Sequence, residues 1–372
     1  MVPPLSKPAD HAFLTRQERL RARIENQKLS LLIVTNPSNI FYLTGFRGSA
    51  GVAVLGPSDA RLWVDPRYTL QAREQAHGVE VIEARTSLLS VVGQWIRSRK
   101  AHRVGYDDGH LTCAEFRTLR ERSASKSRGA AWERAGGINE ELRVVKDASE
   151  IELIRQAGQL TAAVFEEIRP LARPGAREAD LAAEIEYRLR RNGAEGVAFE
   201  TIVASGARGA LPHARASSKR LEAGELVIFD LGAILGGYAA DMTRTMYLGT
   251  PRRRVQRLYA AVLEAERAAV EAVRAGVRAS DVDAAARRAL KRRDLDRYFT
   301  HSTGHGVGIE VHEQPRLGRG EKSRLEAGSV VTVEPGIYLE GFGGIRIEDT
   351  VLVGPNGAEV LTPAAKDNWA VR

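Results

Sequence analysis

The sequence predicts a two-domain α/β protein whose second domain contains two copies of one supersecondary unit. At 372 residues the chain exceeds the ~250–300 residues at which a single hydrophobic core stops growing, which favours two domains. Segments 221–246 and 325–351 are similar, because both open with LEAG followed by a short apolar run. This similarity is typical of a duplicated unit and predicts two strand pairs that face each other across a pseudo-symmetric core.

The N-terminal part alternates helical and strand patterns, which is typical of an α/β layer. The turn-forming residues Asn36-Pro37-Ser38-Asn39 are expected to end the first strand. The glycine-rich stretch 48–56 does not fit a dinucleotide-binding fingerprint and is expected to flank a hairpin. Residues 1–12 are proline-rich and are expected to be frayed. Helices are expected at 15–28, 67–76, 87–98 and 113–122, and strands at 31–35, 52–55, 61–64, 79–82 and 103–105.

A boundary is expected near Ala135-Gly136-Gly137, which divides the chain into domains 1–138 and 139–372. Asp147 has the position of a helix N-cap, with Glu150 three residues later as in a capping box. The helix that it starts is expected to end near residue 171. Further helices are expected at 179–191, 252–275 and 281–292, the last capped by Ser280 with Asp283 at its third position, and a strand at 199–204.

Each copy of the repeat carries two acidic residues at matching places. Asp230 and Glu334 each follow the glycine of LEAG by six residues, and Asp241 and Glu348 each precede a threonine by two residues. Because side chains two apart on a strand share a face, these four carboxylates can point into one pocket. Close carboxylates repel one another unless some are protonated or cations lie among them.

The segment between the copies, HSTGHGVGIEVHEQP, adds His301, His305 and His312. Four carboxylates and an imidazole suit a pair of divalent first-row metal ions such as Mn, Co or Zn. The sequence therefore predicts a dinuclear metal site in the second domain.

Composition excludes several other classes. The net charge of +8 comes from basic residues mixed with acids along helices, which indicates solvated helix faces, with nucleic-acid binding as the weaker alternative. Cys113 is the only cysteine, so no intrachain disulfide can form, which fits a reducing compartment. No signal-peptide pattern and no apolar run of ~20 residues is present. We therefore expect a cytoplasmic protein without membrane or nucleic-acid partners.

The motifs IFDLG, ADMTRT, STGHGVGIEVHEQP, TVEPGIY and GGIRIEDT resemble the Xaa-Pro peptidases of the creatinase/prolidase/methionine-aminopeptidase family. The resemblance runs from about residue 143 to the end of the chain, and it implies the pseudo-symmetric α+β "pita-bread" fold for the catalytic domain. The motifs NIFYLTGFRGSAG and LWVDPRYTLQA resemble the creatinase-like N-terminal domain of aminopeptidase P and its short bacterial relatives.

The resemblance also implies a metal-ligand set. Asp230 would bind the first metal ion. Asp241 and Glu348 would bridge the two ions. His305 and Glu334 would bind the second. All five positions match the family pattern.

Four residues are expected to act in catalysis. By resemblance, His312 lies beside the scissile peptide, His213 contacts the substrate, and Arg346 precedes the bridging Glu348 by two residues. A metal pair lowers the pKa of a bridging water, and the resulting hydroxide would attack the carbonyl before proline. His312 would donate a hydrogen bond to the developing negative charge, and Glu334 would pass a proton to the leaving nitrogen.

The leading hypothesis is a Xaa-Pro aminopeptidase that removes the first residue from peptides with proline second, with Mn²⁺ as the first choice of metal and Co²⁺ or Zn²⁺ as alternatives. A prolidase restricted to Xaa-Pro dipeptides is the nearest alternative, and a pita-bread protein that only binds peptides is the third. The N-terminal domain is expected to mediate self-association into a homodimer or a tetramer.

Overall fold

The computed structural model describes residues 10–124 and 130–371, which form two compact units. One unit ends at Arg143 and the other begins at Val144. The expected boundary at 138/139 coincides with the start of helix α6 (Ile138–Val144), and the units divide near the end of that helix.

The N-terminal unit is one six-stranded sheet with the strand order β4-β3-β2-β1-β5-β6. β1 runs parallel to β5 and antiparallel to β2, and β2 and β3 form the expected hairpin. Helices α4 and α5 cover one face through Val92, Ile96 and Leu119. The strands are β1 (Leu31–Val34), β2 (Val52–Leu55), β3 (Ala60–Val64), β4 (Glu80–Glu83), β5 (Arg103–Tyr106) and β6 (Ala131–Arg134), and the helices are α1 (Asp10–Asn26), α2 (Pro37–Thr44), α3 (Thr69–Gln75), α4 (Leu88–Ser98) and α5 (Cys113–Ser123).

Residues 36–39 follow the end of the first strand as expected, but they form the start of helix α2 and not a turn. The side chain of Asn36 accepts a hydrogen bond of 2.8 Å from the backbone of Ser38 and caps the helix. Pro37 occupies the first helical turn, where its missing N–H costs no hydrogen bond. The expectation of fraying at 1–12 falls largely outside the described residues, and the chain is helical from Asp10.

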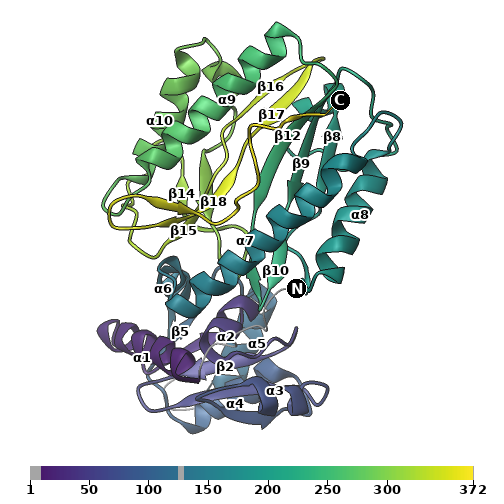
Figure 1. The fold of residues 1–372 in the computed structure, drawn as a ribbon. Helices are drawn as coiled ribbons and strands as arrows, with labels where there is room; N and C mark the ends of the chain where they lie inside the picture. Colours follow the sequence, from purple (N-terminus) through teal and green to yellow (C-terminus); the bar gives the residue numbers. More distant parts are fainter. Residues whose placement is uncertain (1–9, 125–129, 372) are drawn as a thin grey trace. The chain divides into compact units, whose positions relative to one another are not determined.

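The C-terminal unit places two pairs of helices against its sheets (Figure 1). Its sheets have the orders β20-β12-β9-β8, β14-β13-β15-β18-β19, β11-β10-β7 and β16-β17. The helices are α7 (Ala148–Ile168), α8 (Glu178–Arg191), α9 (Arg253–Ala272) and α10 (Ala279–Lys291). The strands are β7 (Gly196–Val197), β8 (Ile202–Ser205), β9 (Leu226–Leu231), β10 (Ala233–Leu235), β11 (Tyr238–Ala239), β12 (Met242–Leu248), β13 (Gly304–Gly306), β14 (Glu313–Leu317), β15 (Val330–Val333), β16 (Gly336–Leu339), β17 (Gly343–Arg346), β18 (Asp349–Val353), β19 (Ala358–Val360) and β20 (Ala370–Val371).

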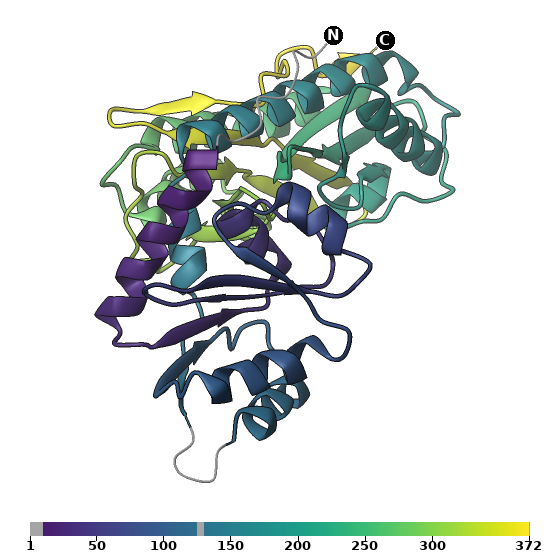
Figure 2. The same cartoon turned by 90° about the horizontal axis from the view of Figure 1, so that it is seen from below.

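The duplication expected from the LEAG repeat is present in this unit. The antiparallel pair β9–β12 belongs to the first copy and the antiparallel pair β15–β18 to the second. Helices α7 and α8 share an apolar core with the first pair, and α9 and α10 share one with the second. The long helix α7 (Figure 2) contributes Phe165, whose ring packs edge-on against Phe229 of β9. Each half therefore buries its sheet under its own helix pair.

The helix expected at 281–292 is confirmed, but its expected cap is wrong. Helix α10 begins at Ala279 with Arg278 as its N-cap, so Ser280 lies inside the first turn. The side chain of Asp283 instead binds Thr303 outside the helix. Among the described residues, no helix has the length and apolar character needed to cross a membrane.

Candidate metal centre

The predicted ligands come from strand ends of both copies. Asp230 lies near the end of β9, opposite Thr243 of β12, and Asp241 directly precedes β12. In the second copy, Glu334 follows β15 and Glu348 directly precedes β18. The backbone N–H of Glu348 donates to the oxygen of Thr243 at 3.1 Å, so the two copies are hydrogen-bonded at the site.

His305 lies in the middle of β13, next to the second copy. Its backbone N–H donates to Oγ1 of Thr332 at 3.1 Å, and the carbonyl of Thr303 accepts from the N–H of Glu334 at 2.7 Å. These bonds set the position of β13 beside β15. The ring Nε2 of His305 lies 3.5 Å from Oε1 of Glu334 and 3.7 Å from Oδ2 of Asp241.

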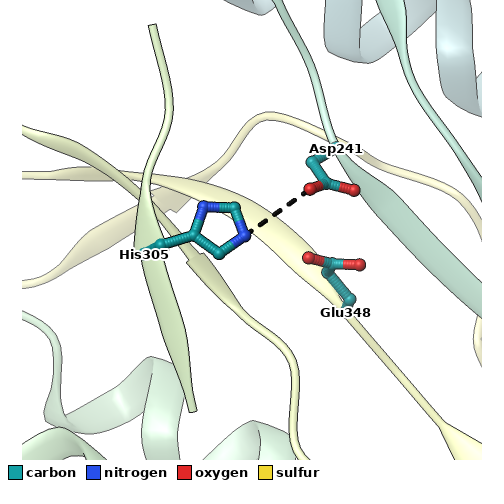
Figure 3. A group of neighbouring side chains, drawn as sticks. All are labelled: Asp241, His305 and Glu348. Carbon is teal, nitrogen blue, oxygen red and sulfur yellow. Dashed lines mark ion pairs between the residues drawn. The ribbon is translucent and has the colours of Figure 1, made fainter. Parts of the chain in front are cut away.

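Asp241, His305 and Glu348 form a compact group, and Figure 3 shows their side chains pointing toward one another. One ligand atom from each lies within 4.8 Å of the others. Glu334 adjoins this group through His305. Asp230 contacts Arg346 instead, but it lies close enough for its charge to raise the pKa of Asp241 and of Glu348. The structure thus brings all five predicted ligands into one region.

Arg346 holds the first of these carboxylates. Its Nη2 lies 2.5 Å from Oδ2 of Asp230, and its Nε donates to Oγ1 of Thr243 at 3.0 Å. That hydroxyl in turn donates to Oε2 of Glu348 at 2.6 Å. Arg346 therefore neutralises one carboxylate and, through Thr243, orients a second.

The histidine tautomers follow from their hydrogen bonds. Nδ1 of His305 lies 3.0 Å from the carbonyl oxygen of Gly306, which can only accept, so Nδ1 carries the proton and Nε2 presents a lone pair to the carboxylates. Burial lowers the pKa of His305 to about 4, so the ring is neutral at pH 7. A neutral imidazole whose second nitrogen donates to a carbonyl is the usual form of a metal ligand.

The buried carboxyl groups are electrostatically crowded. Burial, with the charge of Asp230, raises the pKa of Glu348 to about 8. Burial and neighbouring carboxylates likewise hold the pKa values of Asp241 and Glu334 well above their usual range. Bound cations relieve this repulsion.

The donor set fits divalent metal ions. Oδ1 of Asp230 and Oδ1 of Asp241 are buried and make no hydrogen bond among the described residues, although buried carboxylate oxygens are normally satisfied. Nε2 of His305 lies 3.5 Å from Oε1 of Glu334 and 3.7 Å from Oδ2 of Asp241, so its lone pair faces the same group. Divalent cations bound among these carboxylates would give the two orphaned oxygens a partner.

The predicted catalytic histidines lie at the edge of this group. The ring centroid of His312 lies 4.4 Å from that of His305, and the side chain is exposed. His213 is also exposed, and its charge acts on the pKa of His301. Both side chains are thus open to solvent, His312 beside His305 and His213 within electrostatic range of His301.

Tyr338 was not among the residues predicted from the sequence, and its hydroxyl connects Arg346 to His301. Its hydroxyl accepts from Nη1 of Arg346 at 2.8 Å and lies 2.9 Å from Nε2 of His301. Since Nδ1 of His301 donates to the oxygen of Ser302, Nε2 must accept from Tyr338. The motif TVEPGIY that carries Tyr338 was the available signal.

Residues 152–355 match the model of metallopeptidase family M24, and residues 16–145 match the creatinase/prolidase N-terminal domain. The chain belongs to metallopeptidase family M24. The expected two-domain architecture is confirmed, and membership of the family implies divalent metal ions, for which Asp241, His305 and Glu348 are candidate ligands.

Similar proteins span nearly the whole chain. A Xaa-Pro dipeptidase of Pyrococcus furiosus is 34% identical, over 95% of this chain and 99% of its own. The solved structure of a Xaa-Pro dipeptidase from Bacillus anthracis has a TM-score of 0.92 at 36% identity, over 96% of this chain and 100% of its own. An X-Pro aminopeptidase from Thermotoga maritima has a TM-score of 0.88 at 34% identity, also over 96% of this chain and 100% of its own.

Proposed function

We propose that this M24 protein is a Xaa-Pro dipeptidase, a hydrolase that cleaves the bond before proline in dipeptides. The observation that carries the proposal is near-full-length similarity to the Xaa-Pro dipeptidases of Pyrococcus furiosus and Bacillus anthracis. The grouping of Asp241, His305 and Glu348 supports a metal-dependent reaction in this chain.

Two divalent metal ions fit the donor set, with Mn²⁺ as the first candidate and Co²⁺ or Zn²⁺ as alternatives, since sites rich in oxygen ligands favour such ions. We assign Asp230, Asp241, His305, Glu334 and Glu348 as their ligands. When bound, the metal pair lowers the pKa of a water molecule and polarises the scissile carbonyl.

The remaining roles belong to side chains of the protein. Glu334 moves the proton from water to the departing proline nitrogen, because a carboxylate beside the attacking water can accept its proton and donate it again. His312 donates a hydrogen bond to the carbonyl oxygen as negative charge develops. His213 contacts the substrate, and Arg346 keeps Asp230 in place.

A Xaa-Pro aminopeptidase is the second candidate. The motifs TGFRGSAG and DPRYTLQA favour this activity, and the Thermotoga maritima relative supports it. A dipeptidase needs a closed pocket that binds the free carboxylate of proline, whereas an aminopeptidase needs an open one. We rank the dipeptidase first because the relatives from Pyrococcus furiosus and Bacillus anthracis are Xaa-Pro dipeptidases.

The deciding experiment compares hydrolysis of Ala-Pro with hydrolysis of Ala-Pro-Ala, using metal-stripped protein reloaded with Mn²⁺, Co²⁺ or Zn²⁺. Cleavage of Ala-Pro alone supports the dipeptidase. Release of Pro-Ala from the tripeptide supports the aminopeptidase. If neither peptide is cut with any metal, and Asp241→Ala also leaves the metal content unchanged, the metallopeptidase assignment of this site fails.

Self-association through residues 1–138 remains a prediction. Light scattering on the full chain would measure the mass, and a monomer at all concentrations would contradict it.

A further inference from the structure

The carboxylate of Glu178, at the start of α8, is fully buried and accepts five hydrogen bonds. Oε1 accepts from the backbone N–H and the hydroxyl of Ser205, both at 2.8 Å. Oε2 accepts from the N–H of Ser217 at 3.1 Å, from its hydroxyl at 2.7 Å, and from Nε of Arg208 at 3.0 Å. Ser205 ends β8, and Ser217 lies twelve residues later. One side chain therefore closes both ends of segment 206–216.

This segment carries His213 and is also held at its middle. The oxygen of Gly209 lies so close to Gly344 of β17 that a Cβ atom there would approach it to 2.0 Å. The carbonyl of Pro212 accepts from Nη1 of Arg346 at 3.1 Å. The backbone before His213 is thus fastened to β17 and to the arginine that binds Asp230.

Glu178 is suited to this task because it remains ionised. Burial on its own raises the pKa of Glu178, but the serine donors and Arg208 outweigh it, and the pKa lies below its usual value. A buried carboxylate with this many donors is a strong anchor, because removing it leaves several donors without an acceptor.

The second copy of the unit contains a similar buried carboxylate that accepts hydrogen bonds at the end of a strand. Asp283 of α10 accepts from the N–H of Thr303 at 3.2 Å and from its hydroxyl at 2.8 Å. Thr303 precedes His305 by two residues. Each copy thus uses a buried carboxylate from its second helix to hold a Ser or Thr at a strand end. The Asp283 anchor holds the strand of a metal ligand, whereas the Glu178 anchor holds a segment that carries none.

From this contrast we propose that Glu178 is a positioning residue for substrate, which fixes segment 206–216 so that His213 meets the bound dipeptide. The exposed Leu211, two residues before His213, is presented by the same segment. The inference rests on the proposed function, because it assumes that His213 contacts substrate. It assigns Glu178 to substrate binding and Asp283 to metal binding.

The test uses the full chain loaded with Mn²⁺ and Ala-Pro as substrate. Glu178→Gln keeps the side-chain size, but it replaces the charged carboxylate by a neutral amide in which only one oxygen can accept hydrogen bonds. We expect KM to rise about tenfold or more, kcat to change less than about threefold, and the metal content to equal that of wild type. Ser217→Ala, which opens only the far end of the segment, should shift KM in the same direction by about threefold.

Two comparison variants separate this role from general destabilisation. Asp283→Asn should weaken Mn²⁺ binding and leave KM at saturating metal near that of wild type. Glu264→Gln removes a surface carboxylate that pairs with Arg292 and Arg293, and it should change neither quantity. A fall in kcat or metal content for Glu178→Gln at unchanged KM would overturn the inference.

Hydrogen exchange distinguishes failure of this inference from failure of the proposed function. Amides of 206–217 should exchange faster in Glu178→Gln than in wild type, whether or not Ala-Pro is the substrate. If wild type does not cleave Ala-Pro but exchange increases, the anchor stands and the substrate assignment fails. If exchange is unchanged, the anchoring role of Glu178 is disproved.

Discussion

The guanidinium of Arg244 lies 2.8 Å from Oδ1 of Asp349, the residue that follows the proposed bridging ligand Glu348. Both side chains are buried. Nη1 of Arg244 also donates to the backbone oxygens of Glu348, at 2.5 Å, and Thr243, at 3.0 Å. Arg244 therefore binds the first copy of the unit to the second, next to the proposed metal ligand Glu348.

Replacement of Arg244 by Met should lower the free energy of unfolding by about 3–5 kcal/mol, because Asp349 keeps only Lys366 as a charged partner and the buried oxygens of Thr362 and Ala364 lose their donor. Urea unfolding of metal-free protein measures this loss. Asp349→Asn should also destabilise, and the double variant should lose less than the sum of the two single losses. Strict additivity would show that the pair does not interact as described.

Loss of a single proposed ligand carboxylate should lower the amount of bound metal. Asp241→Ala removes a ligand from the compact group with His305 and Glu348. We expect the bound metal to fall below two ions per chain and Ala-Pro hydrolysis to drop about a thousandfold or more, as the loss of several kcal/mol of transition-state stabilisation requires. Elemental analysis after dialysis measures the metal content.

Glu271→Gln is the matched control, because Glu271 is an exposed carboxylate on α9. It should retain both metal and activity. Full metal occupancy in Asp241→Ala would remove Asp241 from the ligand set.

Metal binding should release protons near neutral pH. The pKa of Glu348, raised to about 8, means that this carboxyl group holds a proton at pH 7 in the metal-free site, which a dication must displace. The pKa of Asp241 is shifted in the same direction. Affinity should therefore rise as pH increases toward 8. His305, with a pKa of about 4, should not compete above pH 5. Calorimetric titration with Mn²⁺ in two buffers of different ionisation enthalpy measures the release, and equal heats in both would contradict it.

The repeat and the alternation of residues along strands were sufficient to predict the strand pairs that carry the site. Thr243 shares the inward face with the acids and donates to Glu348, as alternation requires. Asp349 points the other way and binds Arg244, again as alternation predicts. These relationships are local, so they can be obtained from sequence alone.

The supporting contacts could not be predicted in this way. Glu178 binds serines 27 and 39 residues away, and Tyr338 binds His301 across 37 residues. Such pairs depend on the tertiary packing of sheets and helices, and this packing cannot be predicted from a local sequence pattern. The misassigned turn at Asn36 had a readable signal, because Asn followed by Pro is also the start of a capped helix. In that case turn and helix signals coincide, and tertiary packing decides between them.

Glu266 on α9 should make stability depend on pH. Burial raises its pKa from 4.5 to about 7, against the opposing charge of Lys366, which lies 2.6 Å from Oε1. Between pH 4.5 and 7 the folded chain keeps this proton while the unfolded chain has lost it, so the free energy of unfolding falls as pH rises through this window. Asp349 and Arg244 also act on this carboxyl group, with opposite effects.

Glu266→Gln should therefore flatten the decline of stability between pH 4.5 and 7 relative to wild type. Urea unfolding of chelator-treated protein at several pH values measures both curves. Subtracting one from the other cancels the contribution of the metal-site carboxyl groups, which both proteins share. Glu271→Gln should give a curve parallel to wild type, because its side chain is exposed. A Glu266→Gln curve with the same slope as wild type would mean that Glu266 titrates at the same pH in the folded and unfolded chains.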